Sequence, residues 1–406
     1  MSVQEGFTTK RKREDEYEEL EKQLLEIRTA RFQATTEDQI RTFVVAGLQN
    51  LIEKVSNLRK SSKARALLRA ARSQLALTLY QDTELFWKGD AVATALGCKY
   101  KLARAVMSYD FPEHEAACVD GNDDHRDMVR VLDKALSAQM LARLARAFAP
   151  RSAFWSEHQY DAVGTGGRPL GYFSYVHALA PTTSDTYMDT VIDEVYKLAC
   201  DKFEDMRHAR YAEWWAHCRP HSSGHQMHFD SDDEGNCGVR NPICSTVIYL
   251  TRAGLGGPTL VTDQTLASTR LAEKGWLCHP RYNRVCMFDG KLLHGVVPGR
   301  GPVEDPSERR VSLMIAFWRD IQVRGNGDND PGAARSFPSA SATYSWPRDL
   351  KQEPSTVTTE DPVEPTEVLL ARGRPVWEDV DRKANGFMEL SKLLCVPSYA
   401  LCFQGF

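Results

Sequence analysis

The stretch GHQMHFDSDDEG, Gly224 to Gly235, places two histidines next to a run of carboxylates, and His221 stands just before it. Within it, His228 and Asp230 are two residues apart. Alternate side chains of a β-strand point to the same face, so on a strand this imidazole and this carboxylate would converge on one point. Such a pair needs one more ligand to hold a metal ion.

The candidate for that further ligand is His294, in the segment FDGKLLHGVVPGR. The preceding run NRVCMFDG is expected to be a strand that ends at a turn, and LLHGV begins the next run. Two histidines and one carboxylate on neighbouring strands make the facial triad of non-haem Fe(II) oxygenases. Such a triad leaves coordination positions open for a co-substrate and dioxygen.

A basic residue and a hydroxyl follow in RRVSLMIAFW, where Arg310 and Ser312 share one face of an expected strand. Arg309 has the opposite parity, and the R-x-S spacing with the apolar alternation that follows selects Arg310 as the inward residue. A guanidinium can bind a carboxylate through two hydrogen bonds, and the serine hydroxyl adds a donor. The distal carboxylate of 2-oxoglutarate would need this if its keto-acid end chelated the iron.

The order H-x-D, distal His and R-x-S, over β-rich sequence from about 150 to 322, resembles the 2-oxoglutarate- and Fe(II)-dependent dioxygenases. The runs HFDSDDE, STVIYLT, GGPTLVTDQ, FDGKLLHGVVPG and RRVSLMIAFW resemble their double-stranded β-helix core. By that resemblance, His228, Asp230 and His294 bind Fe(II), while Arg310 anchors 2-oxoglutarate together with Ser312. Collagen-type prolyl hydroxylases resemble this order but generally have Lys at the arginine position.

The resemblance implies hydroxylation of a substrate with release of succinate and carbon dioxide, and ascorbate as an optional reductant. The halogenating branch of the family replaces the carboxylate ligand by a small residue, so the presence of Asp230 favours hydroxylation or oxidative dealkylation. A protein side chain is the favoured substrate, because a large helical region suits a macromolecular partner. The alternatives are oxidative demethylation of nucleic acid, oxidation of a small molecule, and a non-catalytic β-fold that serves as a binding or scaffold module.

Other residues near the expected site have plainer interpretations. If the strand begins near Gln226, His225 faces away from the candidate ligands and is expected to be a turn histidine. A zinc site built from the histidines at 221, 225 and 228 is disfavoured on a glycine-rich turn. Among the aromatic residues Trp214, Trp215 and Tyr249, the tyrosine is the best candidate to contact the co-substrate, and core packing is the alternative for all three.

The elements that must position these residues indicate an α+β protein, with an N-terminal α-helical region followed by a double-stranded β-helix (jelly-roll or cupin-like) catalytic domain. Stripes at three- and four-residue steps predict the helices, and short runs divided by Gly, Pro, Asn and Asp predict the strands. Expected helices cover about 14–34, 35–58 with Thr35 or Thr36 as N-cap, 63–79, 124–148 and 185–204, and a strand covers 171–179. The expected organisation is a disordered basic tail over 1–13, a helical domain over 14–150, the dioxygenase domain over 151–322, a Pro/Ser/Gly-rich linker over 323–365 and a C-terminal segment packing on the body over 366–406.

Composition limits the cellular setting. The formal net charge of −4 gives no global attraction for nucleic acid, which is therefore not favoured as a partner. The ten cysteines include no C-x-x-C pair, which in a chain of 406 residues indicates reduced intracellular thiols. No secretory signal or membrane span is expected, and KRKR at Lys10 to Arg13 fits either a solvated tail or a nuclear address. An intracellular protein, cytoplasmic or nuclear, is therefore expected, and self-association through the N-terminal helices is a further expectation.

Overall fold

The structure is a computed structural model, and its backbone is described for most of the chain. The described residues are 3–58, 61–109, 128–160, 173–179, 186–231, 240–323, 332–338, 344–350, 364–368, 370–373, 375–380 and 401–403, with no side-chain description for 3–13, 332–333 and 371–373.

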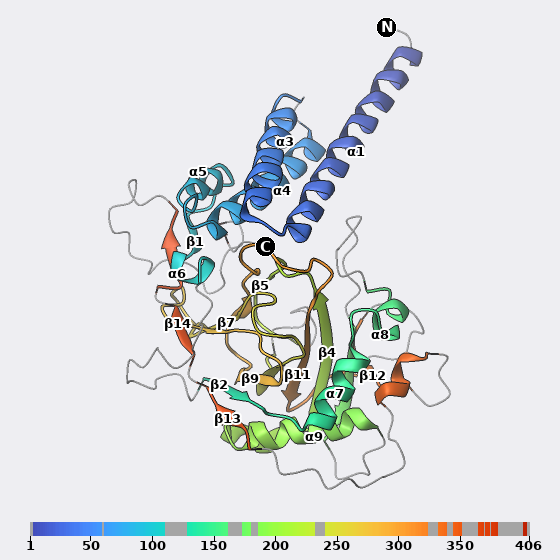
Figure 1. The fold of residues 1–406 in the computed structure, drawn as a ribbon, viewed down its shortest axis with the longest axis vertical. Helices are drawn as coiled ribbons and strands as arrows, with labels where there is room; N and C mark the ends of the chain where they lie inside the picture. The colour runs from blue at the N-terminus through green and yellow to red at the C-terminus, as the bar shows by residue number, and fades with distance from the viewer. Residues whose placement is uncertain are drawn as a thin grey trace.

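Two large sheets form the body of the molecule (Figure 1). The larger sheet contains, in spatial order, β12 (Gly332–Ser336), β3 (Phe173–Ala178), β4 (Tyr211–Arg219), β11 (Arg310–Trp318), β6 (Cys244–Tyr249), β9 (Arg284–Asp289), β2 (Val129–Asp133) and β13 (Thr366–Glu367). The smaller sheet contains β14 (Ala371–Gly373), β8 (Gly275–Cys278), β7 (Thr259–Thr262), β10 (His294–Val296) and β5 (His225–His228). Side chains from both sheets share one buried cluster, so the sheets face each other as in the jelly-roll that was expected.

Strand β11 shows how the sequence positions a site inside this body. All nine of its residues are buried. Leu313, Ile315 and Phe317 point to the outer side, where they join the main hydrophobic core. Ser312 and Met314 have the opposite parity and line a cavity on the inner side. The alternation of a strand therefore separates packing residues from candidate functional residues.

Helices pack on the outer face of the larger sheet, where Figure 1 shows α9 below the sheet and α7 and α8 to its right. These are α7 (Ala138–Ala147), α8 (Ala153–Glu157) and α9 (Tyr187–Cys200), together with the short η3 (Glu204–His208) and η4 (Trp346–Leu350). Helix α9 begins with a capping box in which Thr186 and Asp189 satisfy each other's backbone N–H groups. Its apolar stripe packs against the same core as the outer side chains of β11.

The N-terminal region forms a separate helical layer above the sheets (Figure 1). It contains α1 (Val3–Gln33), α2 (Glu37–Gln39), the π-helix η1 (Ile40–Val45), α3 (Ala46–Ser56), α4 (Ser62–Gln81), α5 (Lys88–Ala95) and α6 (Arg104–Met107). Of the two expected caps, Thr36 is the one used, and its hydroxyl accepts the N–H of Gln39 at 3.2 Å. A three-stranded sheet of β15 (Trp377–Asp379), β1 (Tyr100–Leu102) and β16 (Cys402–Phe403) packs beside this layer.

Two expectations about the first part of the chain were wrong. Helix α1 begins at Val3, where a disordered tail over 1–13 was expected. The helix expected over 124–148 is instead the strand β2 followed by α7. The run VRVLD carries buried valines at alternate positions, and β2 pairs with β9 on one side and β13 on the other. Pairing with distant strands overrides the local helical pattern at this point.

The parts of the last eighty residues that are described pack on the body. In the region expected to be a linker, β12 pairs in parallel with β3, and η4 buries Trp346 in the main core. The C-terminal strands β13, β14, β15 and β16 each pair with a strand from an earlier part of the chain. Most of the expected linker, and the side chains of the KRKR run, lie outside the described residues.

Two further expectations concern the thiols and the membrane. None of the seven cysteines that the structure describes takes part in a disulfide bond. Among the helices it describes, none is both long and apolar enough to cross a bilayer.

Candidate functional site

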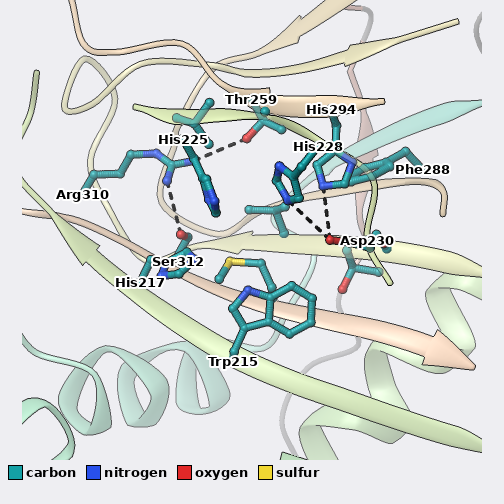
Figure 2. Close-up of a pocket in the computed structure, with 16 residues that line it drawn as sticks. Trp215, His217, His225, His228, Asp230, Thr259, Phe288, His294, Arg310 and Ser312 are labelled. Atoms are coloured by element: carbon teal, nitrogen blue, oxygen red, sulfur yellow. Dashed lines mark hydrogen bonds and ion pairs between the residues drawn. The ribbon is translucent and has the colours of Figure 1, made fainter. Parts of the chain in front are cut away.

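The two candidate histidine ligands lie directly opposite each other on paired strands. Antiparallel pairing of β5 with β10 sets His228 against His294. Asp230 lies two residues beyond the end of β5, and its carboxylate points back toward both rings (Figure 2). One ligand atom from each of these residues lies within 4.8 Å of the other two. The structure therefore brings together the three residues that the sequence selected.

A hydrogen bond to a backbone carbonyl fixes the orientation of each imidazole. Nδ1 of His228 lies 2.8 Å from the carbonyl oxygen of Gln226, and Nδ1 of His294 lies 3.0 Å from that of Leu292. A carbonyl can only accept, so both Nδ1 atoms carry the proton. In the neutral rings Nε2 is then an electron-pair donor, and each Nε2 lies 3.5 Å from Oδ1 of Asp230.

The carboxylate of Asp230 is held just as firmly. Ser245 on β6 donates its hydroxyl to Oδ2 at 2.6 Å, which leaves Oδ1 to face the histidines. Burial favours the neutral carboxyl, but His294 and His228 outweigh it and hold the pKa of Asp230 well below its usual range. Burial also lowers the pKa of His294, yet the neighbouring carboxylate raises it by more, so the net shift is upward. The centre of the triad therefore attracts positive charge.

This donor set fits a transition-metal ion. Two neutral imidazole Nε2 atoms and one carboxylate oxygen point at a common centre, and backbone carbonyls and a serine hydroxyl fix them from outside. Without a cation or a proton between them, three electron-pair donors at these distances would repel one another. Two histidines and one carboxylate on one side of an open cavity are the ligands typical of non-haem Fe(II).

The three candidate ligands form part of the wall of a cavity between the two sheets (Figure 2). The empty space of this cavity, part of which is open to solvent, is about 470 Å³. Most of the remaining wall is apolar or aromatic. The lining residues are Trp215, His217, His225, His228, Asp230, Ser245, Thr246, Val247, Thr259, Phe288, His294, Gly295, Val296, Arg310, Ser312 and Met314.

Arg310 lies across the cavity from the triad (Figure 2). Its side chain is buried, with Nη1 3.3 Å from the hydroxyl of Ser312 and Nη2 3.4 Å from that of Thr259. Burial lowers the pKa of this guanidinium, and no carboxylate of the described residues pairs with it. A buried cation without a counter-ion is costly, so the site favours an anion from outside. Arg309 instead donates to the backbone carbonyls of Pro306 and Glu308.

Tyr249 does not line the cavity, which differs from its expected contact with the co-substrate. Its hydroxyl lies 2.7 Å from Oγ1 of Thr259 and 3.1 Å from the carbonyl oxygen of Cys278. The guanidinium carbon of Arg310 lies 5.3 Å from the centre of its ring. From outside the cavity, Tyr249 therefore positions Thr259 through its hydroxyl and contacts Arg310 with its ring. The strand parity of β6 places Tyr249 on the inner side of the sheet, but the intervening β7 covers it.

The two adjacent tryptophans of β4 separate by parity. Trp215 lines the cavity, and Trp214 is buried in the core on the other side of the sheet. The indole N–H of Trp214 donates to Nε2 of His177 at 3.0 Å. Core packing therefore accounts for Trp214, whereas Trp215 belongs to the cavity wall.

Several lining residues were not predicted from the sequence, among them His217, Thr259 and His225. His217 faces Ser312 across the pairing of β4 with β11, and Thr259 lies in the run GGPTLVTDQ, which was expected in the β-rich core without a role at the site. His225 was expected to face away, but its ring stacks on that of His228 with the centroids 4.6 Å apart. A register irregularity in the β5–β10 pairing accounts for this, because a bulge changes the direction of the side chains beside it. Sequence spacing carried no signal for the bulge.

Comparisons with known proteins find similar chains among solved structures. No family model and no curated protein matches the chain. It resembles the structure of a prolyl-4-hydroxylase from Pseudomonas putida at 16% identity and a TM-score of 0.30, with 49% of this chain and 92% of that chain covered. It also resembles a 2OG-Fe(II) oxygenase family oxidoreductase from Burkholderia pseudomallei (18% identity, TM-score 0.28, 50% and 84% covered). A third is EvdO2 from Micromonospora carbonacea var. aurantiaca (13%, 0.33, 52% and 96%).

Proposed function

We propose that this protein is an Fe(II)- and 2-oxoglutarate-dependent oxygenase that hydroxylates its substrate. The observation that carries the proposal is the convergence of His228, Asp230 and His294, with both Nδ1 atoms bound to backbone carbonyls. In this assignment the three side chains hold Fe(II). When bound, the iron and 2-oxoglutarate would activate dioxygen, so that one oxygen atom enters the substrate and succinate and carbon dioxide leave.

Other residues of the cavity would bind the co-substrate and exclude water. Arg310 would bind the distal carboxylate of 2-oxoglutarate, because it supplies a buried positive charge with no carboxylate partner among the described residues. Ser312 and Thr259 lie within hydrogen-bond reach of its guanidinium and would complete the cradle. The apolar wall that includes Trp215, Phe288 and Met314 would exclude water from the cavity.

A protein side chain remains the substrate class that we favour. The large helical region beside the β body suits a macromolecular partner, which is the reason for this choice. Oxidation of a small molecule, demethylation of a nucleic acid and a purely scaffolding role are the competing assignments. Ascorbate as a reductant stays a prediction.

The first experiment measures succinate formed from 2-oxoglutarate by the purified full-length protein under Fe(II) and air. Oxygenases of this kind turn over slowly without their substrate, so we expect a low but metal-dependent rate that a chelator abolishes. His294→Ala should lose both this rate and stoichiometric Fe(II) binding, measured under argon by metal analysis. His208→Ala, at an exposed position, is the control and should retain both. If wild-type protein binds no Fe(II) under argon, the assignment fails.

A second variant distinguishes binding of 2-oxoglutarate from binding of Fe(II). Arg310→Met should still bind Fe(II), since the arginine does not contact the triad. It should bind 2-oxoglutarate about 10- to 100-fold more weakly, the range expected for losing a charge-assisted hydrogen bond worth about 1.5–3 kcal/mol. Titration of 2-oxoglutarate into Fe(II)-loaded protein under argon would measure this. Equal affinity in wild type and variant would remove Arg310 from the cradle.

A further inference from the structure

A second polar crevice lies between the helical layer and the β body, away from the cavity that holds the triad. Its empty space, part of which is open to solvent, is about 320 Å³. Its walls come from the end of α1, from α2, η1 and α4, and from two segments of the body. The lining residues are Arg31, Glu37, Ile40, Thr78, Gln81, Asp82, Ser222, Gly299 and Gly301.

Arg31 brings a buried positive charge to this crevice. Its residue is only 7% exposed, and its guanidinium donates to Oε1 of Gln81. No carboxylate of the described residues pairs with it. Arg28, one turn earlier on α1, does not line the crevice, but its guanidinium adds positive charge near Arg31. A buried guanidinium that meets only a neutral amide retains most of its desolvation cost.

Ser222 provides an independent sign of a missing ligand. The residue is 6% exposed, and its hydroxyl has no hydrogen-bond partner among the described residues. Leaving a buried hydroxyl unpaired costs free energy, so native structures pair almost all such groups. Arg31 and Ser222 come from distant parts of the chain but line the same space. The guanidinium can only donate and the serine hydroxyl can also donate, so a ligand that pairs with both groups is an acceptor.

The carboxylates of the crevice do not serve as that acceptor. Asp82 already accepts Nε of Arg41 at 2.7 Å and Nη2 at 3.1 Å, together with the backbone N–H groups of Glu84 and Leu85. Glu37 lies at the exposed edge, and no ion pair joins it to Arg31. Thr78 and Gln81 are also engaged, through Gln74 and Pro298.

We propose that Arg31 and Ser222 form a binding site for a small oxyanion, a phosphate or carboxylate group, at the junction of the helical layer and the β body. The guanidinium would supply the charge and paired N–H donors, and the serine hydroxyl would supply a further donor. This site does not depend on the oxygenase assignment. Its anion would join α1 to the segment that connects β4 with β5, and thus to the strand of His228.

Thermal unfolding of the full-length protein at constant ionic strength tests this, with sodium phosphate in one series and sodium acetate in another. The wild-type midpoint should rise with anion concentration. Arg31→Met should weaken the response at least tenfold, and Ser222→Ala should weaken it several-fold. A larger response to phosphate would assign a phosphate group, and a larger response to acetate a carboxylate. The absence of any response in wild type would overturn the proposal.

Three control variants establish where the anion binds. Lys22→Met, on the exposed face of α1, should keep the wild-type response, and Arg310→Met, which removes any anion bound in the triad cavity, should keep the part of the response that depends on Arg31. If Arg310→Met abolished it instead, the anion would be binding in that cavity and the proposal would fail. Glu37→Gln should bind the anion at least as well as wild type. If it lost stability in anion-free buffer to the same extent as Arg31→Met, Glu37 itself would be the partner, and the crevice would hold no external ligand.

Discussion

At the scale of single residues, the atoms behind the triad decide what the triad can bind. The carbonyl groups of Gln226 and Leu292 place the proton of each imidazole on Nδ1. Ser245 turns the carboxylate of Asp230 so that Oδ1 faces the rings. None of these three residues would touch the metal, yet each sets the direction of a ligand atom.

The substitution Ser245→Ala tests this support. The carboxylate would lose the donor on Oδ2 and gain freedom to rotate, so we expect Fe(II) affinity to fall about 10- to 100-fold, as is usual when the outer partner of a ligand is removed. Competition with a chromogenic chelator under argon would measure it. Ser156→Ala, at an exposed position of α8, should keep wild-type affinity. Unchanged affinity in Ser245→Ala would show that the rest of the site holds Asp230 without the serine.

At the scale of elements, tight loops bring backbone against the functional side chains. Gly256 has a φ of +81°, and a Cβ at this position would overlap the side chain of Arg310. Its N–H donates to Nδ1 of His221 at 2.9 Å, and the other ring nitrogen of His221 binds the carbonyl of Arg300 at 3.1 Å. The loop before β7 therefore packs closely against Arg310, and a hydrogen bond to His221 holds it in place.

Gly256→Ala and Gly254→Ala form a matched pair for this loop. Both glycines have φ near +80°, so either alanine should cost about 1–2 kcal/mol of backbone strain. Only the Cβ at 256 meets Arg310, whereas the one at 254 has open space apart from the tip of Arg252. We expect both variants to lose stability in urea titrations, and only Gly256→Ala to lose 2-oxoglutarate affinity. Equal affinities would contradict the close fit.

The junction of α8 with β3 predicts a pH dependence of stability. His158 lies between the carbonyl of Phe154 and the hydroxyl of Tyr175, which suits the neutral ring. Burial is the main cause that lowers its pKa from 6.5 to about 4, Arg335 also lowers it, and Glu157 opposes the shift. The unfolded chain therefore takes up this proton at a higher pH than the folded protein.

The free energy of unfolding should accordingly fall as the pH drops from about 6.5 to about 4, by about 3 kcal/mol from this group. Urea titrations across that range would measure the slope. His158→Gln should show a shallower decline, because it removes the titrating group. His208→Gln, at an exposed position, should follow the wild type. Parallel curves for wild type and His158→Gln would refute the assignment.

At the scale of the whole molecule, the helical layer contacts the segment that follows the candidate ligand His294. Gln81 at the end of α4 donates to the carbonyl of Pro298 at 2.8 Å. In the other direction, the guanidinium of Arg300 donates three hydrogen bonds, to the carbonyl oxygens of Gln81, Ser108 and Tyr109. The helices are therefore tied by polar contacts to the chain that continues from β10, and the site and the helical layer share this connection.

Arg300→Met tests how much that connection stabilises the fold. It would leave several carbonyls at the layer junction without their charged donor, so we expect a loss of about 2 kcal/mol in the free energy of unfolding. Arg319→Met removes an exposed ion pair with Asp205 and should cost less than about 1 kcal/mol. Chemical denaturation would compare them. Similar losses in the two variants would mean that the Arg300 bonds contribute little.

The sequence alone determined which side chains share a face. A strand has a period of two residues, so H-x-D pointed His228 and Asp230 the same way, and R-x-S chose Arg310 over Arg309. This alternation of side chains depends only on the local geometry of one strand. The residues of the triad could therefore be named before any contact between strands was known. The alternation also predicted the apolar side of β11 correctly.

Only the tertiary structure decided which faces meet. The bulge beside β5 turned His225 into the cavity, and β7 covered Tyr249 and brought Thr259 to Arg310 instead. Pairing with β9 and β13 made a strand of residues whose local pattern predicted a helix. The crevice of Arg31 exists only because α1 packs beside a loop far along the chain. These outcomes depend on the register and packing of distant segments. The spacing of residues within one segment does not determine either of them.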